Sequence, residues 1–89
     1  MVVVTLNANG FSKDFELPGN EKLGKLYLRI LFLLKEKEPR IFGDCYGIIF
    51  EINGKGLLDK SSTLFDYGVC TGYELQIVEE EKYHGFVVK

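Results

Sequence analysis

The sequence predicts an α+β fold in which a mixed sheet of four or five strands packs on one long helix. Three observations predict it. Residues 2–17 alternate apolar and polar side chains, as a β-hairpin does. Residues 21–37 repeat apolar side chains at helical spacing. Strand-like runs then follow at 46–53, 57–58 and 73–78.

The hairpin is predicted by the alternation on both sides of Asn9-Gly10, a dipeptide that favours a tight turn because both residues tolerate positive φ. One face of the first strand carries Val2 and Val4, and one face of the return strand carries Phe15 and Leu17. We expect Phe15 to lie opposite Val4, and Leu17 opposite Val2, on the side of the core.

The helix is expected to run from about Glu21 to Lys37. Asn20 would be its N-cap, and Glu21 would place a negative charge in the first turn, where the helix dipole favours it. Pro39 should end the helix at or before Glu38, because the residue before a proline avoids the helical conformation. We expect one broad apolar face to cover the sheet: Leu23, Leu26, Tyr27, Ile30, Leu33 and Leu34.

Leu28 and Phe32 fall on the opposite side of this helix, together with Gly24. They are four residues apart and are therefore neighbours on the helix surface. A single helix on a single sheet offers them nothing to pack against. Two interpretations are open. Either they are scattered exposed apolar residues of the ordinary kind and the loop at Ile41-Phe42 folds over them, or they form a surface for a protein partner or a second copy of the chain.

The second half of the chain supplies the remaining strands. In the run 73–78, Leu75 and Ile77 are expected to point inward and Val78 outward. In the run 46–53, Ile49 takes the face opposite the main apolar one.

Residues 63–68 are expected to form a short helical turn closed by Gly68. The order of elements, from hairpin and helix to the final strand, is that of a β-grasp domain. We expect this domain to span residues 1–80. Residues 81–89 are expected to form a mobile C-terminal tail, because charged terminal segments favour solvent.

Composition limits the kind of protein this can be. The 89 residues suffice for one domain, and 46% of them are hydrophobic. The net charge of −2 gives no reason to expect nucleic-acid binding, which needs an excess of Lys and Arg. No apolar run is long enough to insert into a membrane, and no signal peptide is recognisable, so we expect a cytoplasmic protein.

Catalytic chemistry is not expected. The only histidine, His84, lies in the predicted tail, so neither Cys45 nor Cys70 has a base on a rigid element. Both thiols are expected to be free, with Cys70 packing as a small hydrophobe and Asp44 raising the pKa of Cys45. No ligand spacing indicates a metal, and no motif indicates a cofactor. The sequence therefore predicts a protein that is not an enzyme.

Three segments resemble ubiquitin: Gly54-Lys55-Gly56-Leu57, then Thr63 to Val69 with its Leu-x-Asp-Tyr pattern, then Leu75-Gln76-Ile77-Val78. Glu51 and Gln76 stand where ubiquitin has the isoleucine and histidine of its apolar patch, so the resemblance implies that this patch is lost. Ubiquitin and the sulfur carriers act through a C-terminal diglycine, whereas this sequence ends in Val87-Val88-Lys89.

The sequence also resembles the bacterial ubiquitin-like proteins of the YukD/EsaB type. The resemblance lies in Lys55-Gly56-Leu57-Leu58, in the Leu-x-Asp-Tyr turn and in Gly72 just before the last strand. That family lacks the diglycine and is associated with type VII (ESX-like) protein secretion. The resemblance implies a cytosolic accessory component of such an apparatus. Two alternatives stay open: a ubiquitin-like or sulfur-carrier modifier whose tail is trimmed at Gly85, and a noncatalytic β-grasp subunit of a multicomponent enzyme.

The predicted function is thus a protein-interaction module. We expect its partner-binding residues to be Leu28, Phe32, Gly24, Ile49 and Val78. The expected partner is a protein, such as a component of a secretion apparatus, and the back of the helix is also a candidate surface for a homodimer.

Overall fold

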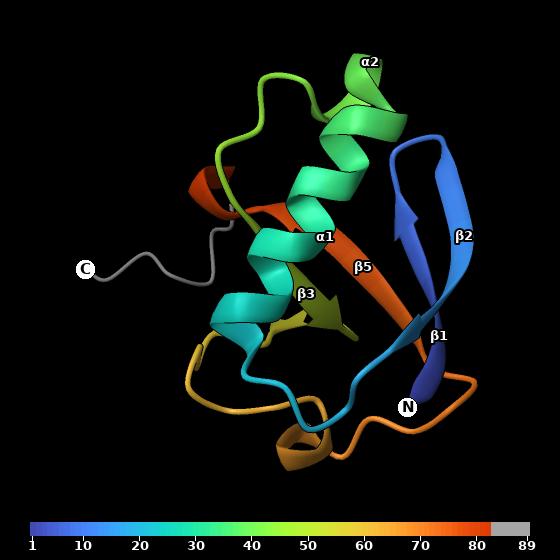
Figure 1. Ribbon diagram of the computed structural model, residues 1–89, viewed down its shortest axis with the longest axis vertical. Coiled ribbons are helices and arrows are strands. Elements are labelled where there is room, and N and C mark those ends of the chain that lie inside the picture. Colours follow the sequence, from blue (N-terminus) through green and yellow to red (C-terminus); the bar gives the residue numbers. More distant parts are fainter. Residues whose placement is uncertain (83–89) are drawn as a thin grey trace.

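The computed structural model describes residues 1–82, which form a mixed five-stranded sheet in the order β2-β1-β5-β3-β4. Helix α1 (Leu23–Lys37) lies across one face of this sheet (Figure 1). The predicted α+β fold is confirmed. The strands are β1 (Val2–Ala8), β2 (Phe11–Leu17), β3 (Ile48–Ile52), β4 (Lys55–Gly56) and β5 (Glu74–Glu79).

The N-terminal hairpin has the predicted register. β1 pairs antiparallel with β2, which sets Val2 opposite Leu17 and Val4 opposite Phe15. The turn between the strands contains Gly10 at φ 74°, a conformation that glycine adopts without steric cost. The local alternation and the turn dipeptide were therefore sufficient to specify this register.

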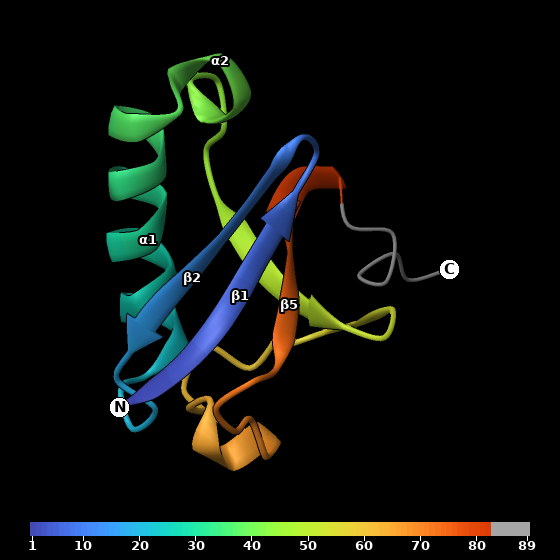
Figure 2. The same cartoon turned by 90° about the vertical axis from the view of Figure 1, so that its right-hand side faces the viewer.

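The sheet is completed by β5, which pairs parallel with β1 and antiparallel with β3. Figure 2 shows β2, β1 and β5 side by side. The short strand β4 begins two residues before the predicted Leu57-Leu58. Leu57 nevertheless extends the ladder, because its N–H donates to the carbonyl of Phe50 at 2.8 Å.

The start of α1 differs from the prediction. Lys22, not Asn20, is the N-cap, and no side chain caps the helix. The first N–H groups are instead satisfied by a loop distant in sequence: Leu23 donates to the carbonyl of Ser62 at 2.8 Å, and Gly24 donates to that of Lys60 at 3.0 Å. A tertiary contact thus replaces the predicted cap, and Glu21 lies outside the helix.

The end of α1 is as predicted, at Lys37, but the following segment is a second short helix, α2 (Pro39–Phe42). Proline suits the first position of this helix, because its fixed φ is helical and its missing N–H would have no partner there. The helix face that meets the sheet also includes the buried Leu31, while Leu33 is only half-buried.

A 3₁₀ turn, η1 (Phe65–Tyr67), joins β4 to β5. It ends at Gly68 with φ 77°, as the sequence predicts. Leu64, at its start, is completely buried in the core, and Val69 follows it inward. The turn therefore closes the end of the sheet from which α1 starts (Figure 1).

The last described element is a second 3₁₀ turn, η2 (Glu80–Lys82). Glu81 and Lys82 of the predicted tail belong to this turn, and the rest of that tail lies outside the described residues. Within residues 1–82, no helix has the length and apolar character needed to cross a membrane.

Candidate protein-interaction surface

Leu28 and Phe32 form an exposed apolar pair on the outer side of α1, which we call the α1 patch. Leu28 is 68% exposed and Phe32 is 72% exposed. No other element of the described chain crosses this side of the helix (Figures 1 and 2). The spacing of four residues keeps the two side chains adjacent on successive turns.

The alternative in which Ile41-Phe42 covers the α1 patch is wrong. Phe42 is buried, and its ring meets that of Phe11 edge-on with centroids 5.9 Å apart. Ile41 also packs against the core. The reason is Pro39, which starts α2 and directs the chain toward the hairpin instead of back along α1.

The other predicted partner-binding residues have different environments. Ile49 has no exposed surface and so cannot contact a partner in this conformation, and Val78, its neighbour across the β3–β5 ladder, is half-buried. Gly24 lies against the loop of the chain itself: a β-carbon there would be 3.3 Å from Cβ of Lys60. We therefore assign Gly24 to packing between the helix and this loop.

A groove that the sequence did not predict lies beside the α1 patch, between α1 and β2. We call it the α1–β2 groove; it is open and has a volume of about 610 Å³. Its apolar lining includes Phe15 and Leu17 from β2 and Ile30 and Leu33 from α1. Leu28 and Phe32 also line it, so the α1 patch and the groove are one continuous apolar surface. Of its lining residues, the sequence singled out Leu28 and Phe32 as exposed, whereas Phe15 was expected on the core side and is only half-buried.

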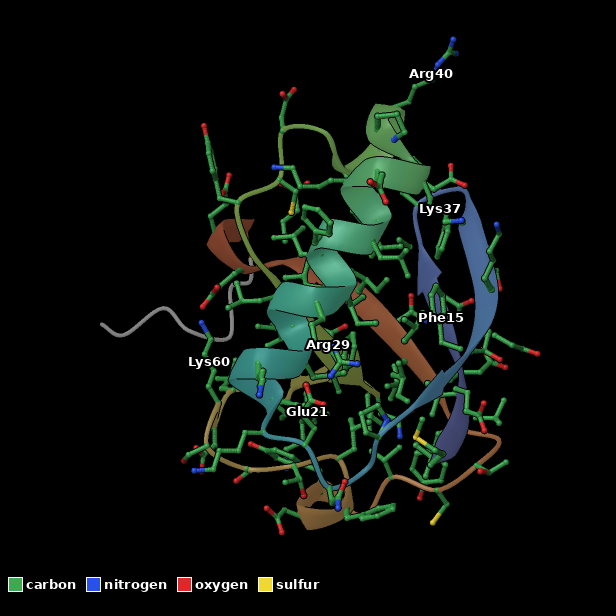
Figure 3. The ribbon with its side chains drawn as sticks, viewed as in Figure 1. Phe15, Glu21, Arg29, Lys37, Arg40 and Lys60 are labelled. Atoms are coloured by element: carbon green, nitrogen blue, oxygen red, sulfur yellow. The ribbon has the colours of Figure 1, made fainter. Side chains whose placement is uncertain are left out.

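Charged side chains border this surface. Glu16 and Glu36 line the groove from opposite sides, one on β2 and one on α1. Arg29 also lines it, but its guanidinium donates to Glu21, so its charge is already paired (Figure 3). Within residues 1–82, Glu16 and Glu36 are the groove-lining side chains that carry a charge and form no ion pair, and the α-amino group of Met1 adds a positive charge at the groove.

The sheet face that ubiquitin uses is polar here, as the resemblance implies. Glu51 on β3 lies directly opposite Gln76 on β5. Glu51 is half-buried and Gln76 is exposed. An apolar contact like that of ubiquitin is therefore not available at these two positions.

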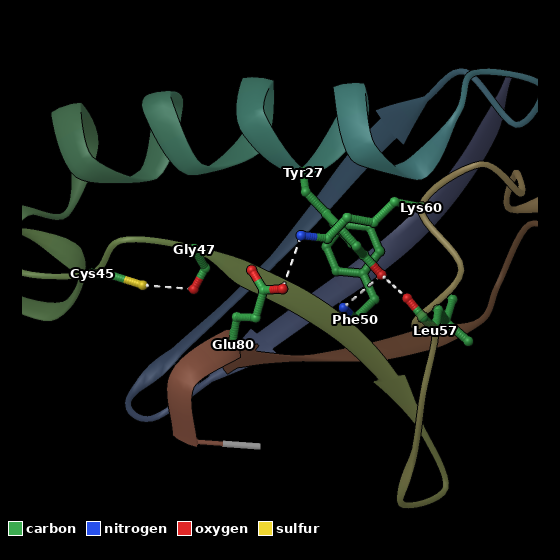
Figure 4. Close-up of polar contacts among 7 residues, drawn as sticks. All are labelled: Tyr27, Cys45, Gly47, Phe50, Leu57, Lys60 and Glu80. Atoms are coloured by element: carbon green, nitrogen blue, oxygen red, sulfur yellow. Dashed lines mark hydrogen bonds and ion pairs between the residues drawn. The ribbon is translucent and has the colours of Figure 1, made fainter. Parts of the chain in front are cut away.

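The buried hydroxyl of Tyr27 has two main-chain partners (Figure 4). The hydroxyl of Tyr27 donates to the carbonyl of Leu57 at 2.6 Å and accepts from the N–H of Phe50 at 3.1 Å. Burial raises the pKa of Tyr27 well above its ordinary value, so the hydroxyl stays a donor even at alkaline pH. The arrangement ties α1 to β3 and to the residue after β4.

The two cysteines are free. Cys45 is buried and donates to the carbonyl of Gly47 at 3.2 Å, whereas Cys70 is exposed, contrary to the prediction that it packs as a small hydrophobe. Burial raises the pKa of the Cys45 thiol, with a further contribution from Glu79 and Glu81; the predicted direction is right, but Asp44 is not the cause.

These environments predict unequal thiol reactivity. At pH 8, Ellman's reagent should label Cys70 at least about tenfold faster than Cys45, because the thiolate is the reactive form and Cys45 is both buried and less ionised. Cys70→Ser should remove the fast phase, and Cys45→Ser should retain it. Equal rates in the folded wild-type protein would contradict the assigned environments.

In residues 1–82, no group of three or more His, Cys, Asp or Glu side chains could hold a metal ion. The described part does present an exposed apolar patch and an adjoining groove, which together are the candidate surface.

No protein-family model and no curated protein sequence matches the chain. Solved structures do match. The ubiquitin-like domain of the type VII secretion system protein ECCD1 from Mycobacterium tuberculosis is 22% identical, with a TM-score of 0.71 over 86% of this chain and 96% of that chain. The EccD5 ubiquitin-like domain from Mycobacterium xenopi is 13% identical, with a TM-score of 0.72 over 86% and 91%.

A ubiquitin-like domain of an Arabidopsis thaliana protein is 19% identical, with a TM-score of 0.67 over 89% of this chain and 77% of that chain. At such low identities these likenesses show the fold. The chain has a ubiquitin-like β-grasp fold, structurally close to the ubiquitin-like domains of EccD proteins.

Proposed function

We propose that the chain is a non-enzymatic protein-interaction module that acts as a cytosolic accessory component of type VII (ESX-like) secretion. The observation that carries this proposal is the exposed α1 patch on a fold that is also found in the ECCD1 and EccD5 domains. The YukD/EsaB-like residues of the Lys55–Leu58 turn support the same assignment.

The α1 patch is suited to binding because covering its two side chains costs little conformational entropy. Leu28 and Phe32 are already held on a helix, so little backbone entropy is lost when they are covered. Covering an exposed Leu or Phe side chain completely contributes roughly 1.5–3 kcal/mol. The adjoining groove extends the apolar area that a partner can cover.

The test is to recover the tagged chain from its native cells and identify co-purifying proteins by quantitative mass spectrometry. The wild-type chain should enrich a membrane or ATPase component of a type VII apparatus. The Leu28→Asp/Phe32→Asp variant should lose at least about tenfold of this enrichment, because it places two charges where the partner must exclude water.

Tyr73→Asp is the matched control, since Tyr73 is an exposed aromatic residue on the segment before β5. It should leave the enrichment unchanged. Thermal unfolding should show that all variants remain folded, because exposed substitutions change stability by only about 0.5 kcal/mol. Failure to enrich any secretion component with the folded wild-type chain would contradict the proposed function.

The same samples address the alternatives. Light scattering of the purified chain distinguishes a homodimer through the α1 patch from a monomer, since the double variant would abolish a dimer of this kind. Intact-mass measurement of protein from native cells addresses trimming, because a chain that retains Lys89 cannot be a carrier processed at Gly85.

A further inference from the structure

β2 is an edge strand of the described sheet, with β1 on one side only. The main-chain groups of odd-numbered residues in β1 bond to the segment that leads into β5. The N–H of Thr5 donates to the carbonyl of Tyr73 at 3.0 Å, and the carbonyl of Val3 accepts from the N–H of Gly72 at 2.9 Å. The even-numbered residues of β1 therefore pair with β2.

The register then identifies the outward-facing groups of β2. Val4 pairs with Phe15 and Leu6 with Lys13, so the odd-numbered residues of β2 bind β1. The main-chain N–H and C=O groups of Ser12, Asp14 and Glu16 consequently point away from the sheet. They form a row to which another strand can add.

The α1–β2 groove lies next to this row. In a strand added to β2, alternate side chains would point toward α1, where Phe15, Ile30 and Leu33 line the groove. The other side chains would lie beside those of Ser12, Asp14 and Glu16, which are exposed. The edge therefore supplies main-chain bonds, and the groove supplies pockets for every second side chain.

Charge decides which strand fits. Asp14 and Glu16 are both acidic and lie on the face of the edge turned away from α1, whereas the basic Lys13 lies on the face toward α1. Two copies paired antiparallel through β2 in the register of greatest overlap would set Asp14 opposite Asp14 of the other copy, and like charges directly opposite each other are destabilising. A strand with lysine or arginine beside these carboxylates is favoured instead, and Glu36 on α1 adds to the acidic surroundings.

We propose that β2 and the α1–β2 groove bind an extended segment of a partner protein in which aliphatic residues alternate with lysine or arginine. The aliphatic side chains enter the groove, the basic ones lie beside Asp14 and Glu16, and the main chain extends the sheet. This proposal rests on the proposed function only in taking the partner to be a protein.

The test uses a synthetic peptide, Lys-Val-Lys-Ile-Lys-Val with blocked ends, added to the ¹⁵N-labelled chain. Binding should slow hydrogen exchange of the Ser12, Asp14 and Glu16 amides at least about tenfold, because these N–H groups become paired. The peptide Glu-Val-Glu-Ile-Glu-Val should bind at least about tenfold more weakly. Asp14→Lys/Glu16→Lys should reverse this preference.

Asp14→Pro removes one outward N–H without removing a main-chain bond to β1, and it should weaken binding of the basic peptide at least about tenfold relative to Asp14→Ala, since both variants lose the bond that the Asp14 carboxylate accepts from the Thr5 hydroxyl at 2.6 Å. Asp14→Ala, which keeps the N–H, isolates the charge effect. The proposal is overturned if neither peptide binds at about 1 mM. Equal binding of the two peptides, or binding without protection of the three edge amides, would also overturn it.

These outcomes are separable from those of the proposed function. If the basic peptide fails while the Leu28→Asp/Phe32→Asp variant still loses a secretion component, the module binds through the α1 patch without strand addition. If the peptide binds as described and no secretion component co-purifies, the edge is a binding site for a protein of another system.

Discussion

Replacing Leu64 by alanine is expected to lower the free energy of unfolding by about 3 kcal/mol. Leu64 has no exposed surface and belongs to the core cluster that the turn around η1 closes. Removing its side chain forfeits the transfer free energy of the lost carbons and leaves a cavity that the neighbouring strands can fill only in part. Urea denaturation followed by circular dichroism measures the change.

Phe65→Ala is the matched control in the same turn. Phe65 is larger than Leu64 but is 52% exposed. Its replacement by alanine should therefore lower the free energy of unfolding by less than about 1 kcal/mol. Comparing neighbouring positions separates burial from the local conformation of the turn. Equal losses at the two positions would be inconsistent with Leu64 as a core residue.

Tyr27→Phe is expected to cost about 2–4 kcal/mol although it removes a single oxygen atom. The substitution leaves the carbonyl of Leu57 and the N–H of Phe50 without the hydroxyl that serves both of them. In the wild type the Tyr27 ring meets Phe50 edge-on, with centroids 5.0 Å apart, and a phenylalanine ring would retain this contact. The loss of stability therefore reports hydrogen bonding and not packing. Urea denaturation at neutral pH measures it.

Tyr67→Phe provides the control for this prediction. The Tyr67 hydroxyl accepts from the N–H of Asp59 at 3.1 Å at an exposed site, where water can replace it, so the expected cost is below about 0.5 kcal/mol. A cost for Tyr27→Phe no larger than this would contradict the role given to the Tyr27 hydroxyl.

The raised pKa of Tyr27 adds a pH dependence with a defined sign. The folded state binds the phenolic proton more tightly than the unfolded state, whose ordinary pKa is 10.0. The contribution of Tyr27 is therefore fully present below pH 10 and declines as the pH rises above 10. The stability difference between the wild type and Tyr27→Phe should shrink over that alkaline range, whereas the difference for Tyr67→Phe should not follow this course.

The sequence determined the elements whose signals are local. Asn9-Gly10 and the period-two alternation specified the hairpin and its register, because a slip of one residue would turn every apolar side chain of the strand outward. Pro39 specified the end of α1, and Gly68 specified the end of the turn at η1. Helical spacing was also enough to place Leu28 and Phe32 on the outer side of α1, which predicted half of the candidate surface.

Only the tertiary structure decided the features that depend on segments far apart in the chain. The start of α1 is set by the carbonyls of Ser62 and Lys60, which no local pattern around residue 20 could reveal. The burial of Ile49 and the packing of Phe42 against Phe11 likewise depend on which elements meet. The α1–β2 groove exists because helix and edge strand lie side by side at a particular separation, and a sequence encodes that separation only through the whole packed core.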